Sequence, residues 1–434
     1  MKSVTLIVLT LFAFQIAAMT QTPQELAELW DKEHVSKKFP SNVRHADVKA
    51  YLHSLKNHGL RVDEVGRSGG NREIYQIEFG RGPLKVFMWS QMHGDEPTAT
   101  SALVDMFAIF QKEKDAAWVK KIAETMTIRA VPMLNPDGAD AYTRRNMQGI
   151  DINRDALDLL TPEARLLKTL RENWNPSIGF NLHNQQELTS AGRAPKQAAI
   201  SLLVVYGDEA KTTSLGHERN IRLSSAIVTA LNNFIPGHIG RYGDEWTPSA
   251  FGDNFSAWGT PTILIETGAL HGKDEMFLVK MNFIAFVTAL NALATGSEAT
   301  QNPAVYLTLP HNSSGVVAHF VFRRATHAGS SDGSTIDIVA SYDRRRAEFL
   351  SPVRLRSVSP GTSVYGLEEY DASQFNVMPR FGNLRPGEFA ELMFYKKDRV
   401  VDFAAPDLEK NFPPDAVFSS GKWFKGKGVV PRVR

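Results

Sequence analysis

The residues best suited to chemistry are two histidines and a glutamate that follow predicted buried strands. His93 and Glu96 stand three positions apart after the apolar run 84–89, and His183 follows the apolar run 178–182. The carboxyl ends of parallel strands meet at one edge of an open α/β sheet, so these side chains can reach one centre. Two histidines and one glutamate form a typical catalytic zinc set with a fourth position open for water. Sites for hard metals use more carboxylates, so the pattern favours one Zn²⁺ ion over magnesium or calcium.

A further carboxylate, Glu266, directly follows the apolar segment 261–265. A carboxylate beside a buried strand is costly unless it is paired or used. Each feature has an ordinary alternative. A lone His-x-x-Glu arises by chance, His183 alone is more often a hydrogen-bonded strand-end histidine, and Glu266 could be an ion-pair partner. Their coincidence at three strand ends favours a catalytic site.

A second polar group lies between Arg144 and Arg154, after the turn sequence 135–138. Arginine holds a carboxylate through two parallel hydrogen bonds and can stabilise a developing oxyanion. The alternative is a surface loop with solvated charges.

Apolar strands and amphipathic helices alternate around these residues, which predicts an α/β domain with a largely parallel sheet. Beyond residue 303 the helical periodicity weakens and strands separated by glycine and proline turns take over. We therefore expect a catalytic domain over residues 21–298 and a small β-rich C-terminal domain of unknown role over residues 304–434. Strands are expected at 84–89, 126–133, 178–182, 200–205 and 261–265, and helices at 23–30, 48–55, 97–110, 162–170, 220–234 and 274–293.

In order and spacing, these residues resemble the M14 family of zinc carboxypeptidases, the carboxypeptidase A-like metallopeptidases. The resemblance covers roughly half the chain and is closest to exported bacterial members. It implies a mixed, mostly parallel eight-stranded sheet with helices on both faces. The motifs that carry it are His93-Gly94-Asp95-Glu96, Asn135-Pro136-Asp137-Gly138, Gly149-Ile150-Asp151-Ile152-Asn153-Arg154, His183 and Glu266.

The resemblance also implies the role of each site residue. Zinc would be bound by His93, Glu96 and His183, and Glu266 would act as the general base and acid.

Arg144 matches the residue that polarises the scissile carbonyl, although the adjacent Arg145 leaves that register open by one position. Asn153 and Arg154 match the pair that holds the substrate's terminal carboxylate. Asp151 matches the acid that orients the first zinc histidine.

One departure from the family concerns the tyrosine that usually precedes the catalytic glutamate. The matching stretch 251–258 offers Phe255 and no tyrosine, and Tyr242 lies further upstream. Which of the two takes the place of the substrate-capping tyrosine is left open.

The composition of the chain excludes several classes of protein. The 434 residues are 43% hydrophobic and 22% charged, which is typical of a globular protein with a large core. Lysine and arginine total 49 and aspartate and glutamate 47, so the formal net charge of +2 argues against nucleic acid as a partner. The absence of cysteine excludes disulfides, thiolate nucleophiles and thiolate-bound zinc.

The N-terminus predicts a signal peptide over residues 1–20. Lys2 precedes an apolar run over 4–18, and small residues around Ala17 and Ala18 suit cleavage. The alternative, a membrane anchor, is disfavoured because a span needs about 20 apolar residues. No later segment is expected to be long and apolar enough to span a membrane. We therefore expect an exported protein, periplasmic or extracellular, without stable membrane insertion.

These observations favour a zinc metallocarboxypeptidase that cleaves the C-terminal bond of peptides, with cell-wall peptides as a candidate substrate. The alternative is an N-acyl amino acid deacylase that uses the same zinc site. A non-catalytic binding protein is less favoured because all three ligands and the base are present.

Overall fold

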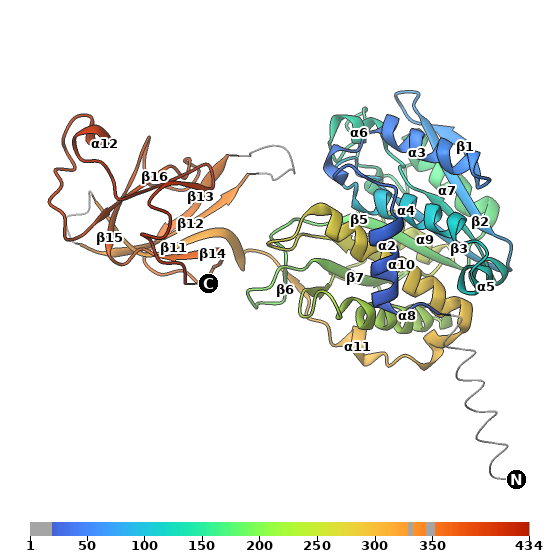
Figure 1. Ribbon diagram of the computed structural model, residues 1–434. Helices are drawn as coiled ribbons and strands as arrows, with labels where there is room; N and C mark the ends of the chain where they lie inside the picture. Colours follow the sequence, from blue (N-terminus) through green and yellow to red (C-terminus); the bar gives the residue numbers. More distant parts are fainter. Residues whose placement is uncertain (1–19, 329–332, 344–351, 434) are drawn as a thin grey trace, which may run out of the picture. The chain divides into compact units, whose positions relative to one another are not determined.

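The computed structural model describes residues 20–328, 333–343 and 352–433 (Figure 1). The signal peptide predicted for residues 1–20 lies outside this range except for Thr20. The chain forms two compact units. The first takes the chain up to Glu187 together with Ala198–Asn312, and the second takes Leu188–Gln197 and the chain from Ser313 onward. The boundary between the units thus falls some residues after the composition change near residue 300. The short segment Leu188–Gln197, which lies within the first unit in sequence, belongs to the second unit.

The first unit is built on a mixed eight-stranded sheet. Its four central strands run parallel, and the strand on each side of them is antiparallel to its central neighbour; the outer pair is antiparallel at one edge and parallel at the other. This arrangement confirms the predicted fold class. In spatial order the strands are β1 (Arg61–Arg67), β2 (Glu73–Gly80), β4 (Met126–Val131), β3 (Leu84–Ser90), β5 (Ile178–Asn184), β9 (Thr262–Thr267), β7 (Ile200–Val205) and β8 (Ile239–Arg241).

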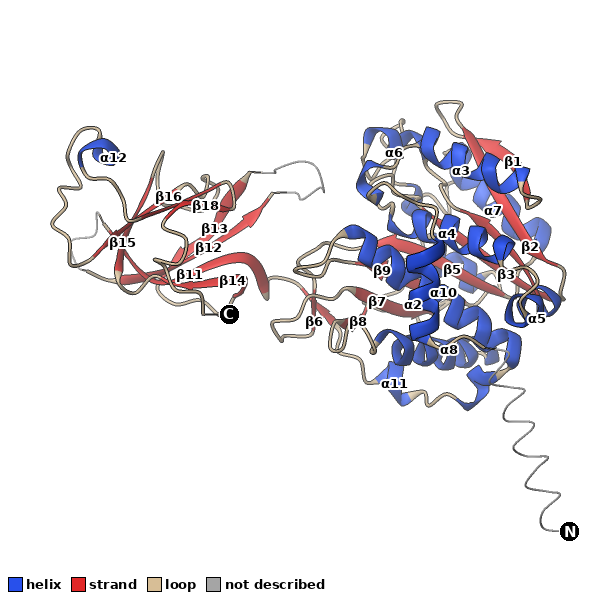
Figure 2. Cartoon of the chain, in the orientation of Figure 1, coloured by secondary structure: helices blue, strands red, loops and turns tan. Residues whose placement is uncertain are grey.

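Helices cover both faces of this sheet (Figure 2). Strand β3 shows why, because its side chains alternate between two apolar clusters. Val86 and Met88 join the larger cluster with α2, α3, α4, α5, α8 and α10, whereas Phe87 and Trp89 join the cluster with α7 and α9. The helices are α2 (Pro23–Glu33), α3 (His45–Asn57), α4 (Thr98–Lys112), α5 (Ala117–Thr125), α6 (Pro136–Ala141), α7 (Pro162–Trp174), α8 (Leu215–Leu231), α9 (Phe251–Ala257), α10 (Glu275–Thr295) and α11 (Ala304–Leu307).

Helix α10 corrects one expectation from the sequence. Among the described residues it is the one helix long and apolar enough to cross a membrane, so the statement that no later segment has that composition was wrong. In the structure, 78% of its most apolar window is buried. Its side chains pack in the larger cluster, and a core helix surrounded by apolar neighbours needs no polar face.

The second unit is rich in β-structure, as predicted. Strand β14 pairs with β11 beside the main path of the sheet, and aromatic and aliphatic side chains fill one cluster under it. A two-stranded ladder joins β6 (Ser190–Ala191) to β10 (Asn312–Ser313). The strands of the main sheet are β11 (Val317–His327), β12 (Thr335–Tyr342), β13 (Val353–Ser359), β14 (Tyr365–Asp371), β15 (Phe375–Pro379), β16 (Leu392–Lys396), β17 (Ala416–Ser419) and β18 (Lys422–Lys425).

Candidate metal centre and active site

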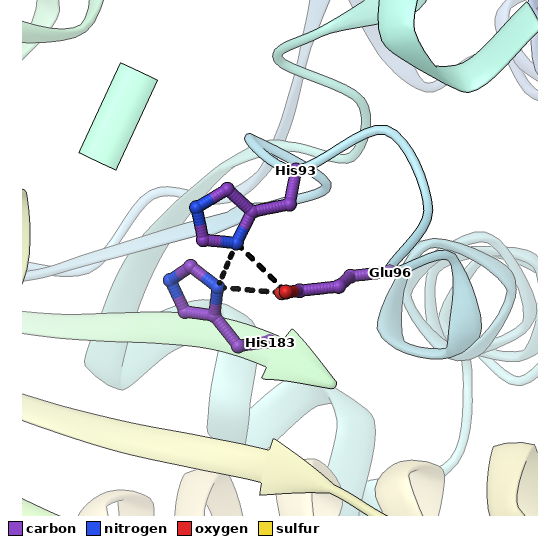
Figure 3. A group of neighbouring side chains, drawn as sticks. All are labelled: His93, Glu96 and His183. Atoms are coloured by element: carbon purple, nitrogen blue, oxygen red, sulfur yellow. Dashed lines mark hydrogen bonds and ion pairs between the residues drawn. The ribbon is translucent and has the colours of Figure 1, made fainter. Parts of the chain in front are cut away.

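The structure brings His93, Glu96 and His183 to one point at the carboxyl edge of the parallel strands (Figure 3). One ligand atom from each lies within 4.8 Å of the others, and all three side chains are buried. Nδ1 of His93 lies 2.8 Å from a Glu96 carboxylate oxygen, and Nδ1 of His183 lies 2.7 Å from the other. The two Nδ1 atoms are 3.1 Å apart. Three potential ligand atoms, all buried, therefore face the same small space.

The chemistry of these atoms fits a bound cation. Nε2 of His93 lies 3.0 Å from Oδ1 of Asp151, and a proton on Nε2 leaves a lone pair on Nδ1 facing His183 and Glu96. Burial opposes a charge on His93, but the negative charge of Glu96 and the bonds to Asp151 and Glu96 raise its pKa to about 9. Burial lowers the pKa of His183. The negative charges of Glu96 and Asp151 therefore favour positive charge at this point, which suits a bound cation such as zinc.

The loop that carries His93 and Glu96 packs against the start of α6. A Cβ atom on Gly94 would lie 1.9 Å from the carbonyl carbon of Gly138, so neither backbone can approach the other without glycine at position 94. Asn135 caps α6 by accepting the Gly138 N–H, and its side-chain NH₂ donates to the Met92 carbonyl. The segment predicted as a turn is therefore the capped first turn of a helix, and it supports the metal loop.

We expect Gly94→Ala to weaken zinc binding by about 10- to 100-fold, the range seen when support around a metal ligand is lost. The added methyl group must push the metal loop away from Gly138. Zinc affinity, measured by competition with a chromogenic chelator, checks this. Gly296→Ala is the control, because it strains a residue with φ +72° at the far end of α10 without a clash. Equal zinc affinities in the two variants would contradict the packing role.

Glu266 lies on β9 beside His183 on β5, and the two residues are paired in the register of these strands. The side chain is buried, and its Oε2 makes no hydrogen bond within the described part of the chain. Burial and the negative charge of Glu96 hold the pKa of Glu266 well above its ordinary value. A buried carboxyl with a free oxygen next to a metal-binding group can exchange a proton with a reacting molecule.

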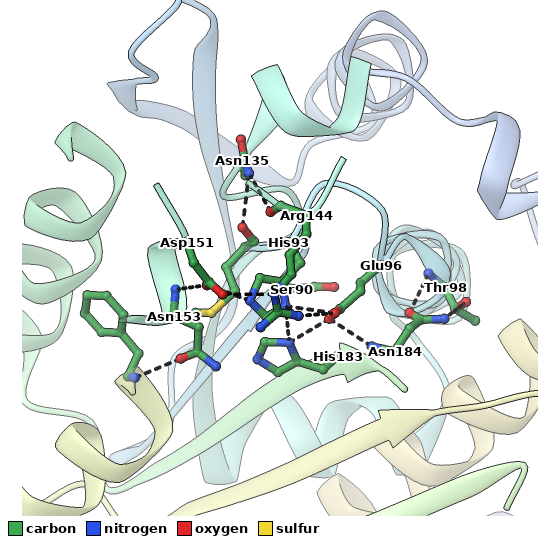
Figure 4. A network of polar contacts seen from close by, with 12 residues as sticks. Ser90, His93, Glu96, Thr98, Asn135, Arg144, Asp151, Asn153, His183 and Asn184 are labelled. Atoms are coloured by element: carbon green, nitrogen blue, oxygen red, sulfur yellow. Dashed lines mark hydrogen bonds and ion pairs between the residues drawn. The ribbon is translucent and has the colours of Figure 1, made fainter. Parts of the chain in front are cut away.

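The two adjacent arginines point in different directions. Nη1 of Arg144 lies 3.2 Å from Oε1 of Glu96, and Nε of Arg144 donates to Asp151 at 2.9 Å (Figure 4). Arg145 instead donates to the carbonyl of Gly149 on the outside of the loop. The register that the sequence left open therefore places Arg144 at the centre, and the structure does not bring Arg145 to it.

Asn153 and Arg154 lie in the 3₁₀ turn η2 (Ile152–Arg154), capped by the side chain of Asp151. Oδ1 of Asn153 accepts the backbone N–H of Phe251 at 2.9 Å (Figure 4). With its oxygen engaged, the side-chain NH₂ of Asn153 has no partner among the described residues. Arg154 is exposed and uses one N–H to contact the Asn153 carbonyl. Both side chains keep donors available for an anionic ligand.

The structure distinguishes the two candidates for the capping aromatic residue. Phe255 is fully buried, with its ring 4.2 Å from that of Trp89 on the sheet face that α7 and α9 cover. Tyr242 is 36% exposed, and the charge of Glu266 is the main cause that raises its pKa to about 12. The Tyr242 hydroxyl therefore lies near enough to Glu266 to be influenced by its charge, whereas Phe255 is a core residue.

Two residues that support the centre were missed in the sequence. The backbone N–H of Asn184 donates to Glu96 at 3.1 Å, and its side-chain amide donates to the hydroxyl of Thr98 at 2.7 Å (Figure 4). Asn184 thereby fixes the carboxylate of Glu96 and the start of α4. Its position directly after His183 was the available signal.

Comparison with known proteins agrees with this geometry. Residues 48–230 match the sequence model of the family described as zinc carboxypeptidase. The chain is 32% identical over 119 residues to carboxypeptidase 2 of Trichophyton rubrum, which is 27% of this chain and 21% of that protein. It is 28% identical over 204 residues to a probable carboxypeptidase 2 of Trichophyton verrucosum, 45% of this chain and 36% of that protein. The matched region thus spans about a third or less of the length of these curated relatives.

Among solved structures, the chain is similar to a metallo-carboxypeptidase from Burkholderia cenocepacia. The sequences are 15% identical, the TM-score is 0.47, and the match covers 58% of this chain and 69% of that one.

Proposed function

Because residues 48–230 match the zinc carboxypeptidase family and the site has a matching set of residues, we propose that the protein is a zinc-dependent carboxypeptidase. It would remove single residues from the C-terminal end of peptides. The observation that carries the proposal is the convergence of His93, Glu96 and His183 beside the free carboxyl oxygen of Glu266. Three protein ligands with an open fourth position are typical of catalytic rather than structural zinc.

His93, Glu96 and His183 would hold a zinc ion, which would supply Lewis acidity and lower the pKa of water at the site. Glu266 is the residue that moves protons. Its free Oε2 can take a proton from the attacking water and later give it to the amine that leaves. Arg144, whose guanidinium faces the same space, can stabilise the oxyanion that develops at the scissile carbonyl.

The residues that would bind the C-terminal end of the peptide explain exopeptidase action. Asn153 and Arg154 offer an amide NH₂ and a guanidinium that can bind a terminal carboxylate. Tyr242, near Glu266, can donate a hydroxyl hydrogen bond to the bound peptide. A peptide held by its terminal carboxylate presents its last amide bond to Glu266, which excludes internal cleavage.

The purified protein is expected to release single C-terminal residues from a peptide library, and a zinc chelator should abolish the release. Mass spectrometry of the products checks this. A parallel panel of N-acyl amino acids separates the peptidase from a deacylase. Internal cuts, or cleavage of acyl amino acids without peptide cleavage, would contradict the proposal.

We further propose that the protein is exported to the periplasm or outside the cell, which would make cell-wall peptides a candidate substrate. The basic and apolar composition of residues 1–20 supports export. N-terminal sequencing of the protein from the extracytoplasmic fraction should find a start just after Ala17 or Ala18. Full-length protein in the cytoplasm alone would contradict export.

A further inference from the structure

A buried carboxylate that the proposed chemistry does not use lies beneath the loop that carries Arg144. Glu163, in the first turn of α7, has no exposed surface. One of its oxygens accepts the backbone N–H of Gly69 at 2.9 Å, and the other accepts the side-chain NH₂ of Asn146 at 3.3 Å. A negative charge is favourable at a helix N-terminus, but this alone does not require the side chain to bind a neighbouring loop. Because a buried carboxylate needs hydrogen-bond donors, the contact with Asn146 is strongly favoured.

Asn146 organises the turn that follows it. It is 5% exposed, and its Oδ1 accepts the backbone N–H groups of Gln148 and Ile150, each at 3.0 Å. Its own backbone N–H donates to the Ile150 carbonyl. Since the amide oxygen is taken by the turn, the NH₂ group donates to Glu163 and, also at 3.3 Å, to the side-chain oxygen of Gln148. Gln148 belongs to the turn itself, so Glu163 is the acceptor outside the turn that favours this orientation of the Asn146 amide, and the amide fixes the turn.

The two ends of this turn are functional. Arg144 precedes it and Asp151 follows it, and their side chains meet at 2.9 Å. The other Asp151 oxygen holds His93. We infer that Asn146 and Glu163 are positioning residues: their buried hydrogen bond sets the turn that delivers Arg144 to the substrate and Asp151 to the metal ligand. This inference rests on the function proposed above.

The direction of the hydrogen bond, with Asn146 as donor and Glu163 as acceptor, provides a test. In Glu163→Gln, an amide NH₂ faces the NH₂ of Asn146, or the Gly69 N–H loses its acceptor. In Asn146→Asp, two carboxylates face each other. The double variant N146D/E163Q restores one donor and one acceptor. The introduced amide can donate to the introduced carboxylate and still accept from Gly69, while that carboxylate still accepts from the turn. The double variant exchanges the donor and the acceptor. Recovery of activity in it would therefore show that the hydrogen bond itself matters, rather than the two substitutions taken singly.

We expect each single variant to lower kcat by on the order of 10- to 100-fold, the cost of small displacements of catalytic groups. The double variant should recover most of the loss. Hydrogen exchange of the Gln148 and Ile150 amides, measured on chelator-treated protein, should be faster in the single variants and restored in the double variant. Glu172→Gln, on the exposed side of the same helix, is the control and should behave as the wild type.

The outcomes distinguish the inference from the function on which it rests. A wild type without peptidase activity overturns the proposed function, while the exchange rates still test the contact. Single variants with wild-type kcat, or a double variant that recovers neither kcat nor exchange, overturn the positioning role. If the single variants do not fold, the folded double variant decides: near-wild-type kcat supports the inference, and a kcat as low as that of Arg144→Ala overturns it.

Discussion

Replacement of Glu266 by glutamine is expected to lower kcat by about 10²- to 10⁴-fold, the usual contribution of a general base or acid. Glutamine has nearly the same shape, so the packing of β9 against β5 should be retained. Glu266 is not one of the three ligands, so zinc should stay bound. What is lost is the carboxylate oxygen that accepts a proton. Steady-state kinetics on a dipeptide substrate, with the zinc content measured on the same samples, checks this.

Glu266→Asp provides the control for this experiment. It retains the carboxylate but withdraws it by one methylene from the reacting water, so an activity between that of the wild type and Glu266→Gln is expected. Thermal unfolding should show both variants folded. Wild-type turnover in Glu266→Gln would exclude the proposed mechanism, because no other buried carboxyl among the described residues has the same free position beside His183.

The convergence of His93, Glu96 and His183 could be predicted because apolar strands lead to these residues, and a parallel sheet collects such strand ends at one edge. The structure adds the pairing of His183 with Glu266 across β5 and β9, which depends on register. Register is set by contacts between distant segments, so no local pattern reveals it. For the same reason Asn184, next to His183, passed unnoticed although its N–H holds Glu96.

The choice between neighbouring or similar residues could not be made from the sequence. Arg144 and Arg145 differ only in the direction that the loop gives them, and the Asn146 turn decides that direction through buried hydrogen bonds. Phe255 and Tyr242 are both aromatic residues upstream of Glu266, and only tertiary packing shows which is in the core.

Some elements were missed because their local signal is weak. Strand β1 is an edge strand and β2 is its neighbour, and many side chains of both are partly exposed or charged, so apolar alternation is poor. Helix α6 was read as a turn because Asn-Pro-Asp-Gly suits both a turn and a capped helix start. In that case the packing of Gly138 against Gly94 selects the helix.

Replacement of Arg144 by alanine is the second large expected effect, a fall in kcat of about 10²- to 10³-fold, the cost of removing one donor to a developing oxyanion. Nη1 of Arg144 lies 3.2 Å from Nδ1 of His93 and from Oε1 of Glu96, beside the candidate metal centre, where the proposed mechanism places the scissile carbonyl oxygen. Because the interaction strengthens as charge develops on the carbonyl oxygen, kcat should fall more than KM rises. Arg144→Lys should recover little, since lysine cannot contact Asp151 and the substrate through a planar fork.

The adjacent arginine supplies the matched control for Arg144→Ala. Arg145→Ala removes the same chemical group one position along the chain, where its one hydrogen bond to the described residues goes to the Gly149 carbonyl. The kcat should stay within about threefold of the wild type, because a single exposed hydrogen bond is worth little. Measuring kcat and KM for both variants on one substrate separates the effect of the orientation of the guanidinium from the effect of losing one positive charge. A large loss in Arg145→Ala with little loss in Arg144→Ala would reverse the assignment. Equal losses would show that the loop contributes net charge rather than one aimed guanidinium.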